Sequence, residues 1–197
     1  MGKHLFAAIA ILLVCGQASA QLEKNKFYPG LSYQNRFKFN YTTYGAGAQL
    51  SYALDRHNLI GVNFTHYRSN KFPLYFQQSD RGFLSGTGLG LTHTYFRYFK
   101  NSKKLGWSIT SDLNFNTIRY YSLKTSGQYQ MDDRYHEIQF SLKPGLFYTP
   151  SRNVIVFANF GGYSLNKGNG YLRSDLNFGS QLNVGVLLNT DIFRKRK

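Results

Sequence analysis

The most regular feature of the chain is an alternation of apolar and polar side chains, which is clearest between residues 105 and 121. Leu113 and Phe115 lie on one face of this stretch, while Asp112, Asn114 and Asn116 lie on the other. Successive side chains of a β-strand point to opposite faces, so a period of two predicts strand rather than helix. The stretch is much longer than a typical strand of about five or six residues.

Eight alternating segments follow one another along the chain. They cover residues 27–40, 44–54, 59–68, 84–99, 105–121, 135–148, 153–164 and 175–193. The seventh segment is apolar on both faces, so its pattern does not tell which face is which. The even number of segments in close succession predicts consecutive antiparallel strands.

The connections between the segments are alternately short and long. Residues 55–58, 100–104 and 150–152 form short polar turns, whereas residues 69–83, 122–134 and 166–174 form long loops. The first connection, at residues 41–43, falls on the loop side but is short. Both termini then lie on the turn side, as in outer-membrane barrels, whose short turns are periplasmic and whose long loops are extracellular.

The composition of the two faces decides which of them meets lipid. The polar face consists mainly of Gly, Ser, Thr, Asn and Gln, and charged residues make up only 17% of the chain. A soluble barrel would show water a face rich in Lys and Glu. Small polar side chains suit a narrow lumen, so we expect the apolar face to meet lipid, and closure to remove the sheet edges that hydrocarbon cannot accommodate. The predicted fold class is all-β, an eight-stranded antiparallel up-and-down transmembrane β-barrel.

Aromatic residues, 17% of the chain, gather near the strand ends and predict a girdle at each membrane interface. The turn-side girdle is expected to contain Phe27, Tyr28, Tyr52, Tyr98, Phe99, Trp107, Phe147, Tyr148 and Phe193. The loop-side girdle is expected to contain Tyr67, Phe72, Tyr75, Phe76, Tyr120, Tyr121 and Tyr135.

The first twenty residues resemble a cleaved secretory signal peptide. Lys3 and His4 precede an apolar run, and small residues end it at Ala20. Lipid attachment at Cys15 is the alternative, but Val14 is larger than the residue that normally precedes a lipidated cysteine. We therefore expect a signal peptide over residues 1–20 and one barrel domain over residues 21–197. Few residues follow Phe193, so we expect no periplasmic domain and no anchoring to peptidoglycan.

Taken together, these features resemble the small eight-stranded outer-membrane barrels of the OmpA and OmpX type. The resemblance is architectural and covers the whole mature chain. It implies location in the outer membrane of a Gram-negative bacterium and contact with the barrel-assembly machinery, which reads an aromatic residue near the end of such chains. Phe193 is near the end, although Ile192 is the residue in register with the apolar face of the last segment.

A formal net charge of +15 points to anionic partners. The export signal argues against nucleic acid and favours outer-membrane lipid and lipopolysaccharide. Seven basic residues fall near the loops, where lipopolysaccharide phosphates would lie: Arg68, Lys71, Arg81, Lys124, Arg134, Lys167 and Arg173. Solvated loops are the plainer interpretation of the same residues.

Charged residues on the inward face form the main candidate site. Arg36, Asp112 and Lys143 are expected at similar depths, with Lys38 and Glu137 nearer the outer end. Buried charges must be paired, so we expect a lumen network. We favour a plug, because eight strands enclose a lumen barely wide enough for their own side chains. The alternative is a gate across a narrow, porin-like channel for ions or small solutes.

Motifs for catalysis, cofactors or metals are weak. His66 and Ser69 invite comparison with lipid A-modifying hydrolases, but residues three apart on one strand lie on opposite faces. The glycines of residues 86–90 lack dinucleotide-binding spacing and are better explained by crowding in the lumen. His136 lacks a second histidine for zinc, and Asp132 with Asp133 supplies too few oxygens for calcium. We expect no cofactor and no metal.

The sequence therefore predicts a non-enzymatic outer-membrane barrel whose extracellular loops contact lipopolysaccharide, another surface or an envelope protein partner. A narrow gated channel is the second interpretation, and a lipid A-modifying hydrolase is the third.

Overall fold

The structure, a computed structural model, describes residues 22–38, 41–69, 82–123, 126–168, 171–176 and 181–190. Within these ranges no helix is long and apolar enough to cross a membrane. The strands are β1 (Phe27–Lys38), β2 (Tyr41–Ala53), β3 (Asn58–Ser69), β4 (Gly82–Tyr98), β5 (Leu105–Leu123), β6 (Tyr129–Ser151), β7 (Val154–Phe160), β8 (Tyr163–Gly168), β9 (Tyr171–Leu176) and β10 (Gln181–Leu188).

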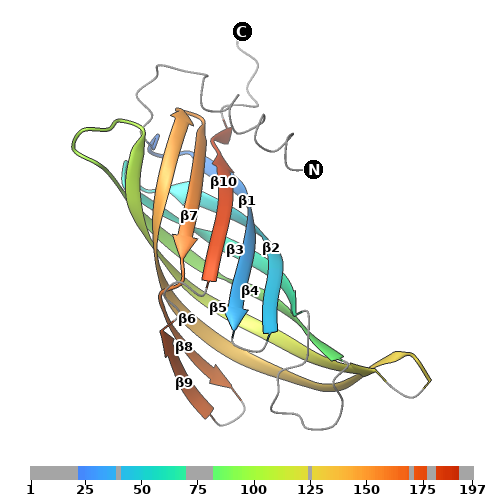
Figure 1. Cartoon of the computed structure of the whole chain (residues 1–197). Helices are drawn as coiled ribbons and strands as arrows, with labels where there is room; N and C mark the ends of the chain where they lie inside the picture. The colour runs from blue at the N-terminus through green and yellow to red at the C-terminus, as the bar shows by residue number, and fades with distance from the viewer. Residues whose placement is uncertain are drawn as a thin grey trace.

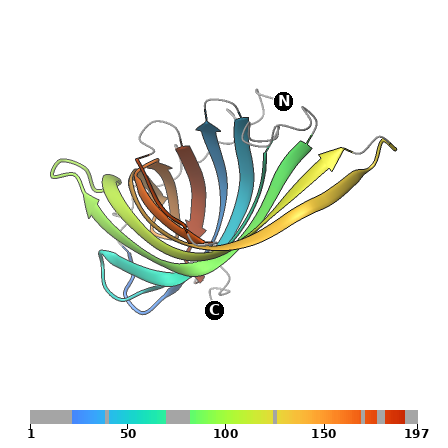
Figure 2. The same ribbon diagram turned by 90° about the horizontal axis from the view of Figure 1, so that it is seen from below.

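Eight of these strands form a closed antiparallel barrel. β1 to β7 pair in sequence order, and β10 closes the wall by pairing with both β7 and β1. The closing ladder runs from Gly30 opposite Leu187 to Arg36 opposite Gln181. Figures 1 and 2 show the strands wrapping around a single interior. The predicted eight-stranded up-and-down barrel is confirmed.

Two of the predicted long loops are mostly strand. β5 continues to Leu123 and β6 begins at Tyr129, so the loop predicted at residues 122–134 is short. β8 and β9 occupy most of residues 166–174 and form a hairpin. This hairpin pairs with the part of β6 that lies beyond the end of β7 (Figure 1). These predictions were wrong because polar residues beyond the apolar band of the wall still pair as strands. Residues 70–81, within the first predicted loop, lie outside the described residues.

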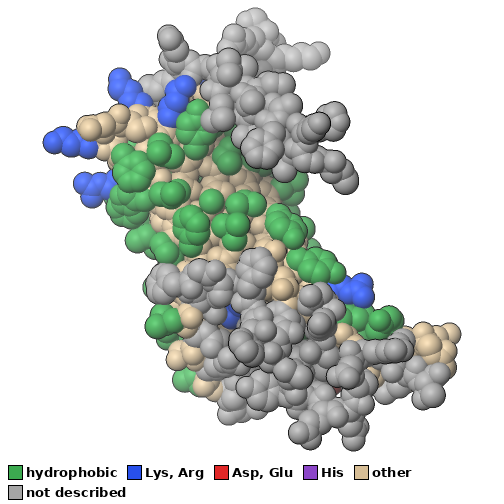
Figure 3. Space-filling view, in the orientation of Figure 1, with side chains coloured by type: hydrophobic (Ala, Val, Ile, Leu, Met, Phe, Trp, Pro, Cys, Tyr) green, Lys and Arg blue, Asp and Glu red, His purple; other side chains and the backbone are tan. Residues whose placement is uncertain are grey.

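The two faces of the wall have the predicted polarity. Leu31, Leu89 and Phe115 point outward and are 67%, 62% and 58% exposed, whereas Asp112 and Asn114 point inward and are buried. Figure 3 shows hydrophobic side chains gathered across the middle of the visible face. Such an exterior around a polar interior is the arrangement of a transmembrane β-barrel.

A bulge between β7 and β8 explains why the seventh segment had no clear pattern. Gly145 pairs with Asn159, and Leu142 pairs with Tyr163, so one more residue lies on the β7–β8 side than on β6. The extra residue reverses the alternation: Phe157 and Asn159 face inward on β7, while Ser164 faces inward on β8. Beside Pro144, Gly162 packs so closely against β6 that a Cβ atom would collide with the Leu142 carbonyl.

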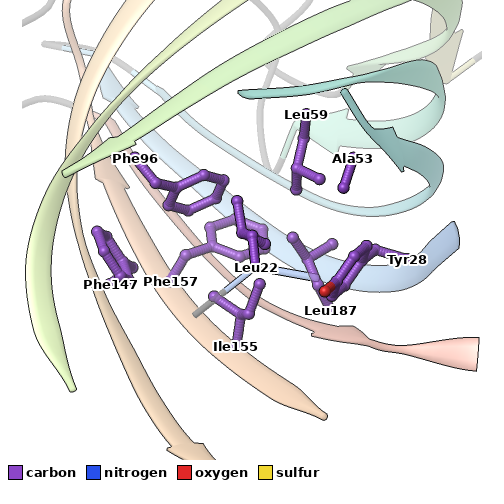
Figure 4. Packing of buried hydrophobic residues seen from close by; sticks show 9 residues of the cluster. All are labelled: Leu22, Tyr28, Ala53, Leu59, Phe96, Phe147, Ile155, Phe157 and Leu187. Atoms are coloured by element: carbon purple, nitrogen blue, oxygen red, sulfur yellow. The ribbon is translucent and has the colours of Figure 1, made fainter. Parts of the chain in front are cut away.

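The lumen is filled by apolar side chains at the turn end. This cluster, called the plug below, contains Leu22, Tyr28, Ala53, Leu59, Phe96, Phe147, Ile155, Phe157 and Leu187, with Tyr98 packed against it. Figure 4 shows these side chains converging from different strands, with Leu22 of the N-terminal segment among them. Phe96 meets Phe147 edge to face at a centroid distance of 4.9 Å.

The plug corrects the predicted turn-side girdle. Tyr28, Tyr98 and Phe147 point into the lumen, whereas Phe27 and Tyr52 lie outside with ring centroids 5.1 Å apart. Trp107, Phe99 and Tyr148 alternate with inward residues and also lie on the outer side, while Phe193 is outside the described residues. The girdle was predicted from the position of each aromatic residue along its strand. The face that a side chain takes is instead set by its parity, that is, by its odd or even position in the alternation.

Candidate functional site

An ion pair between the neighbouring strands β5 and β6 lies inside the lumen above the plug. Lys143 Nζ on β6 lies 2.7 Å from Asp112 Oδ2 on β5, and Asn63 Nδ2 on β3 donates to Asp112 Oδ1 at 3.4 Å. Asp112 is only 5% exposed. A carboxylate this deeply enclosed requires a partner charge and hydrogen bonds, and these two side chains supply them.

Further hydrogen-bonded polar groups form layers on either side of this pair. Thr110 Oγ1 lies 3.2 Å from Thr94 Oγ1 and accepts a 3.3 Å hydrogen bond from Asn159 Nδ2. Toward the loop end, Asn116 Nδ2 donates to Glu137 Oε1 at 3.1 Å and to Gln139 Oε1 at 3.4 Å. The lumen therefore changes from apolar at the turn end to hydrogen-bonded polar layers above it.

The remaining predicted lumen charges lie in β1. Arg36 faces inward between Thr43 on β2 and Gln181 on β10, at the last position where β1 and β10 pair. Lys38 is opposite Tyr41, and its side chain lies outside the described part of the chain. The structure thus brings together Asp112 with Lys143 and Glu137 with Asn116.

The glycines of residues 86–90 provide room inside the lumen, as predicted. A Cβ atom on Gly88 would collide with the Asn116 side chain, and one on Gly90 would collide with Asn114. Gly106 similarly makes room for the ring of Phe147. These glycines are therefore packing positions rather than part of a nucleotide site.

Three arginines form a row on the outer face of the barrel near the loop end. Arg68 on β3 is opposite Ser85 on β4, Ser85 is opposite Arg119 on β5, and Arg119 is opposite Arg134 on β6. We call Arg68, Arg119 and Arg134 the arginine row. Arg68 and Arg134 are exposed, and Arg119 is half-buried.

Polar and aromatic groups border the arginine row. On the turn side of the row, the consecutive cross-strand neighbours are His66, Thr87, Thr117 and His136. Thr117 Oγ1 lies 3.0 Å from His136 Nδ1. On the loop side, the Arg68 guanidinium lies 3.7 Å from the centroid of Phe83, which also stacks on Tyr121 at 4.7 Å.

Only some of the predicted basic residues can be placed. Lys167 is exposed on the outer side of β8, opposite Ile138. Arg173 belongs to β9, but its side chain is not among those described, and Lys71, Arg81 and Lys124 lie outside the described residues. Arg119 was not among the predicted basic residues, because it lies within a strand and not in a loop, although the alternation of β5 places it on the outer face.

The possible hydrolase pair is separated by the wall. His66 is exposed on the outside, whereas Ser69 is buried inside, and its hydroxyl accepts the backbone N–H of Leu84 at 2.9 Å. A base and its nucleophile must be within hydrogen-bond reach. Among the residues described, no group of three or more His, Cys, Asp or Glu side chains is arranged to hold a metal ion.

The chain matches no protein-family model, and no curated protein matches it in sequence. Among solved structures it is similar to Neisserial surface protein A (NspA), with 15% identity and a TM-score of 0.53, covering 83% of this chain and 95% of that chain. It is also similar to the N-terminal β-barrel domain of Pseudomonas aeruginosa OprF, with 13% identity, a TM-score of 0.47 and coverage of 84% and 98%. The attachment invasion locus protein Ail of Yersinia pestis is similar as well, with 11% identity and a TM-score of 0.45, covering 85% of this chain and 97% of that chain. The similarity to NspA, an eight-stranded outer-membrane barrel, confirms the predicted architectural resemblance at the level of the fold.

Proposed function

We propose that the protein is a non-enzymatic barrel of a Gram-negative outer membrane whose loop end contacts lipopolysaccharide or a partner at the cell surface. The observation that carries this proposal is the closed wall with an apolar exterior, a plugged interior and arginines at its loop end. An apolar exterior of this kind requires lipid around it. Assembly of such a wall in the outer membrane is the task of the barrel-assembly machinery.

The plug argues against the channel alternative. Phe96, Phe147 and Phe157 are each at most 7% exposed, and they occupy the lumen on the turn side of the Asp112–Lys143 pair. Ions that crossed the barrel would have to pass this apolar packing without water. We therefore expect planar bilayers containing the folded protein to show no steady single-channel current. A reproducible unitary conductance would instead support the channel alternative.

The hydrolase alternative lacks a catalytic arrangement in the described residues. Since His66 and Ser69 face opposite sides of the wall, neither can activate the other. Lipid A from a deletion strain is expected to have the same mass as lipid A from the parent strain. A mass difference equal to an acyl chain, restored by the wild-type gene, would instead indicate a lipid A-modifying enzyme.

Membrane location and orientation can be tested directly on cells. Outer membranes are purified, and the protein is run on a gel with and without boiling, because folded barrels migrate as compact bands. Protease is then added to intact cells, where cleavage is expected in the connection between β5 and β6 and not in the turn at residues 99–104. A protein recovered in the soluble periplasm, or cleaved only after the cells are opened, would refute the proposal.

A further inference from the structure

The arginine row has the position, charge and spacing of a site for the phosphate groups of lipid A. We infer that the outer face of β3–β6 binds a lipopolysaccharide molecule of the same leaflet, with Arg68, Arg119 and Arg134 holding its phosphates. This inference rests on the proposed membrane location and orientation. It specifies the surface of the barrel that makes the proposed contact and the ligand that this surface binds.

The row lies directly above the part of the wall that faces hydrocarbon. On β5 the outward residues are Trp107, Ile109, Ser111, Leu113 and Phe115, all apolar except Ser111, and polar Thr117 follows them. A membrane crossing takes about 9 to 11 tilted residues, and Trp107 to Phe115 fills that length. Arg119 is four residues beyond Phe115, at the depth where lipid phosphates begin.

Charge repulsion within the row favours a bound anion. Arg119 and Arg134 are directly opposite each other in the β5–β6 ladder. Like charges at directly opposite positions destabilise a sheet. None of the described outward-facing residues of β3–β6 is acidic; Asp133 pairs with the inward residue Tyr120, and its Oδ1 accepts the backbone N–H of Arg134 at 2.7 Å. A phosphate between the two guanidinium groups would replace repulsion with charge-assisted hydrogen bonds.

The row is also long enough for both phosphates of lipid A. Arg68 and Arg134 are separated by three strand intervals, which is about 14–15 Å at roughly 4.8 Å per interval. Lipid A is a disaccharide with a phosphate at each end, so Arg68 can hold one phosphate while Arg119 and Arg134 share the other. Stacking on Phe83 holds the Arg68 guanidinium in place before the ligand binds.

Binding can be measured with purified, folded full-length protein in a non-ionic maltoside detergent, which carries no phosphate. The probes are bisphosphorylated lipid A, the same lipid A with both phosphates removed, and phosphatidylglycerol. The variant R68Q/R119Q/R134Q keeps polar side chains of similar length but removes the three charges. The matched control is R97Q, because Arg97 is an exposed outward arginine at the turn end, opposite Trp107.

We expect wild-type protein and R97Q to bind bisphosphorylated lipid A more tightly than either other lipid. Loss of a charge-assisted hydrogen bond weakens binding about tenfold, so the triple variant should lose at least about a hundredfold. Equal binding of dephosphorylated lipid A or phosphatidylglycerol by the wild type overturns the inference, and this comparison holds even if the triple variant does not fold. An undiminished affinity in the triple variant, or an equal loss in R97Q, overturns it too.

Failure of this inference is distinguishable from failure of the proposed function. If the barrel runs as a compact band, is cleaved on intact cells and shows no preference for lipid A, the proposed function is supported and the lipid A site is refuted. A protein that never reaches the outer membrane would remove both.

Discussion

The Asp112–Lys143 pair gives the most direct test of how the lumen is stabilised. Replacing Lys143 with Met removes the ammonium group that lies 2.7 Å from the carboxylate and leaves Asp112 with the hydrogen bond from the amide of Asn63. Removing one member of a buried ion pair typically costs about 3–5 kcal/mol, because the other charge stays buried without compensation. Asn63 retains part of the stabilisation, so we expect about 3 kcal/mol for K143M.

The double variant D112N/K143M separates the interaction from the side chains themselves. It removes both charges together, so its cost should be about 1–2 kcal/mol, smaller than that of K143M alone. A coupling of about 2 kcal/mol between the two positions is within the range for residues in direct contact. The matched control is Thr94→Val, which removes a neutral hydroxyl contact to Thr110 and should cost about 1 kcal/mol.

Reversible urea unfolding in lipid vesicles measures these differences. With a slope of about 2 kcal/mol per molar, the K143M midpoint should fall by about 1.5 M, and the double variant should lie between K143M and the wild type. If K143M were no less stable than the Thr94→Val control, the pair would contribute little. If the double variant were less stable than the wild type by the sum of the effects of K143M and D112N, the two charges would act independently. Either result would refute the reasoning.

Three further perturbations test the plug, the lumen glycines and one turn. Phe147→Ala opens a cavity in the plug and should cost about 3–5 kcal/mol in the same urea assay. Gly90→Val should prevent formation of the compact band on gels because the side chain collides with Asn114, while Thr87→Val on the outer face of the same strand should fold. In the turn, the backbone N–H of His57 donates to Asp55 and lowers the pKa of its carboxyl group. The carboxylate then stabilises the fold above its unfolded pKa and loses this effect as pH falls through the lower folded pKa, so the stability difference between wild type and Asp55→Asn should shrink in acid. A difference that is constant with pH would contradict this assignment.

The strands and their two faces could be predicted because each depends on local sequence. The apolar residues Leu113 and Phe115 alternate with the polar residues Asp112 and Asn114. Consecutive side chains of a regular strand point to opposite sides, so these four residues alone separate the two faces. The choice of lipid for the apolar face also depended only on which polar residues lie on the other face. These inferences needed no knowledge of which strands are neighbours.

The inward position of two aromatic rings of the plug also follows from the alternation along their strands. Phe147 has the same parity as Lys143 and Ser141, and Tyr28 has the same parity as Ser32 and Gln34. Parity therefore already assigned both rings to the lumen. Grouping aromatics by distance from the strand end mixed inward and outward rings, because both ends of a narrow barrel need large side chains to fill the interior as well as rings to meet the interface.

The arginine row could not be predicted in this way, because it depends on register between strands. Arg68 and Arg119 are far apart in sequence, and they approach each other only because Ser85 pairs with both. A register shift of two residues in one ladder would keep every side chain on its face and still separate the arginines.

The bulge at the end of β7 sets the limit of reasoning from alternation alone. Before it, Phe157 and Asn159 face the lumen at odd-numbered positions, and after it Ser164 and Asn166 face the lumen at even-numbered positions. One extra residue at Gly161–Gly162 exchanges the faces, so a single period fitted across the segment finds apolar residues on both. The exchange lets β7 contribute Phe157 to the plug and lets β8 present Lys167 outside. A failure of periodicity inside an otherwise alternating barrel therefore indicates a bulge, and glycines that pack against a facing proline mark its position.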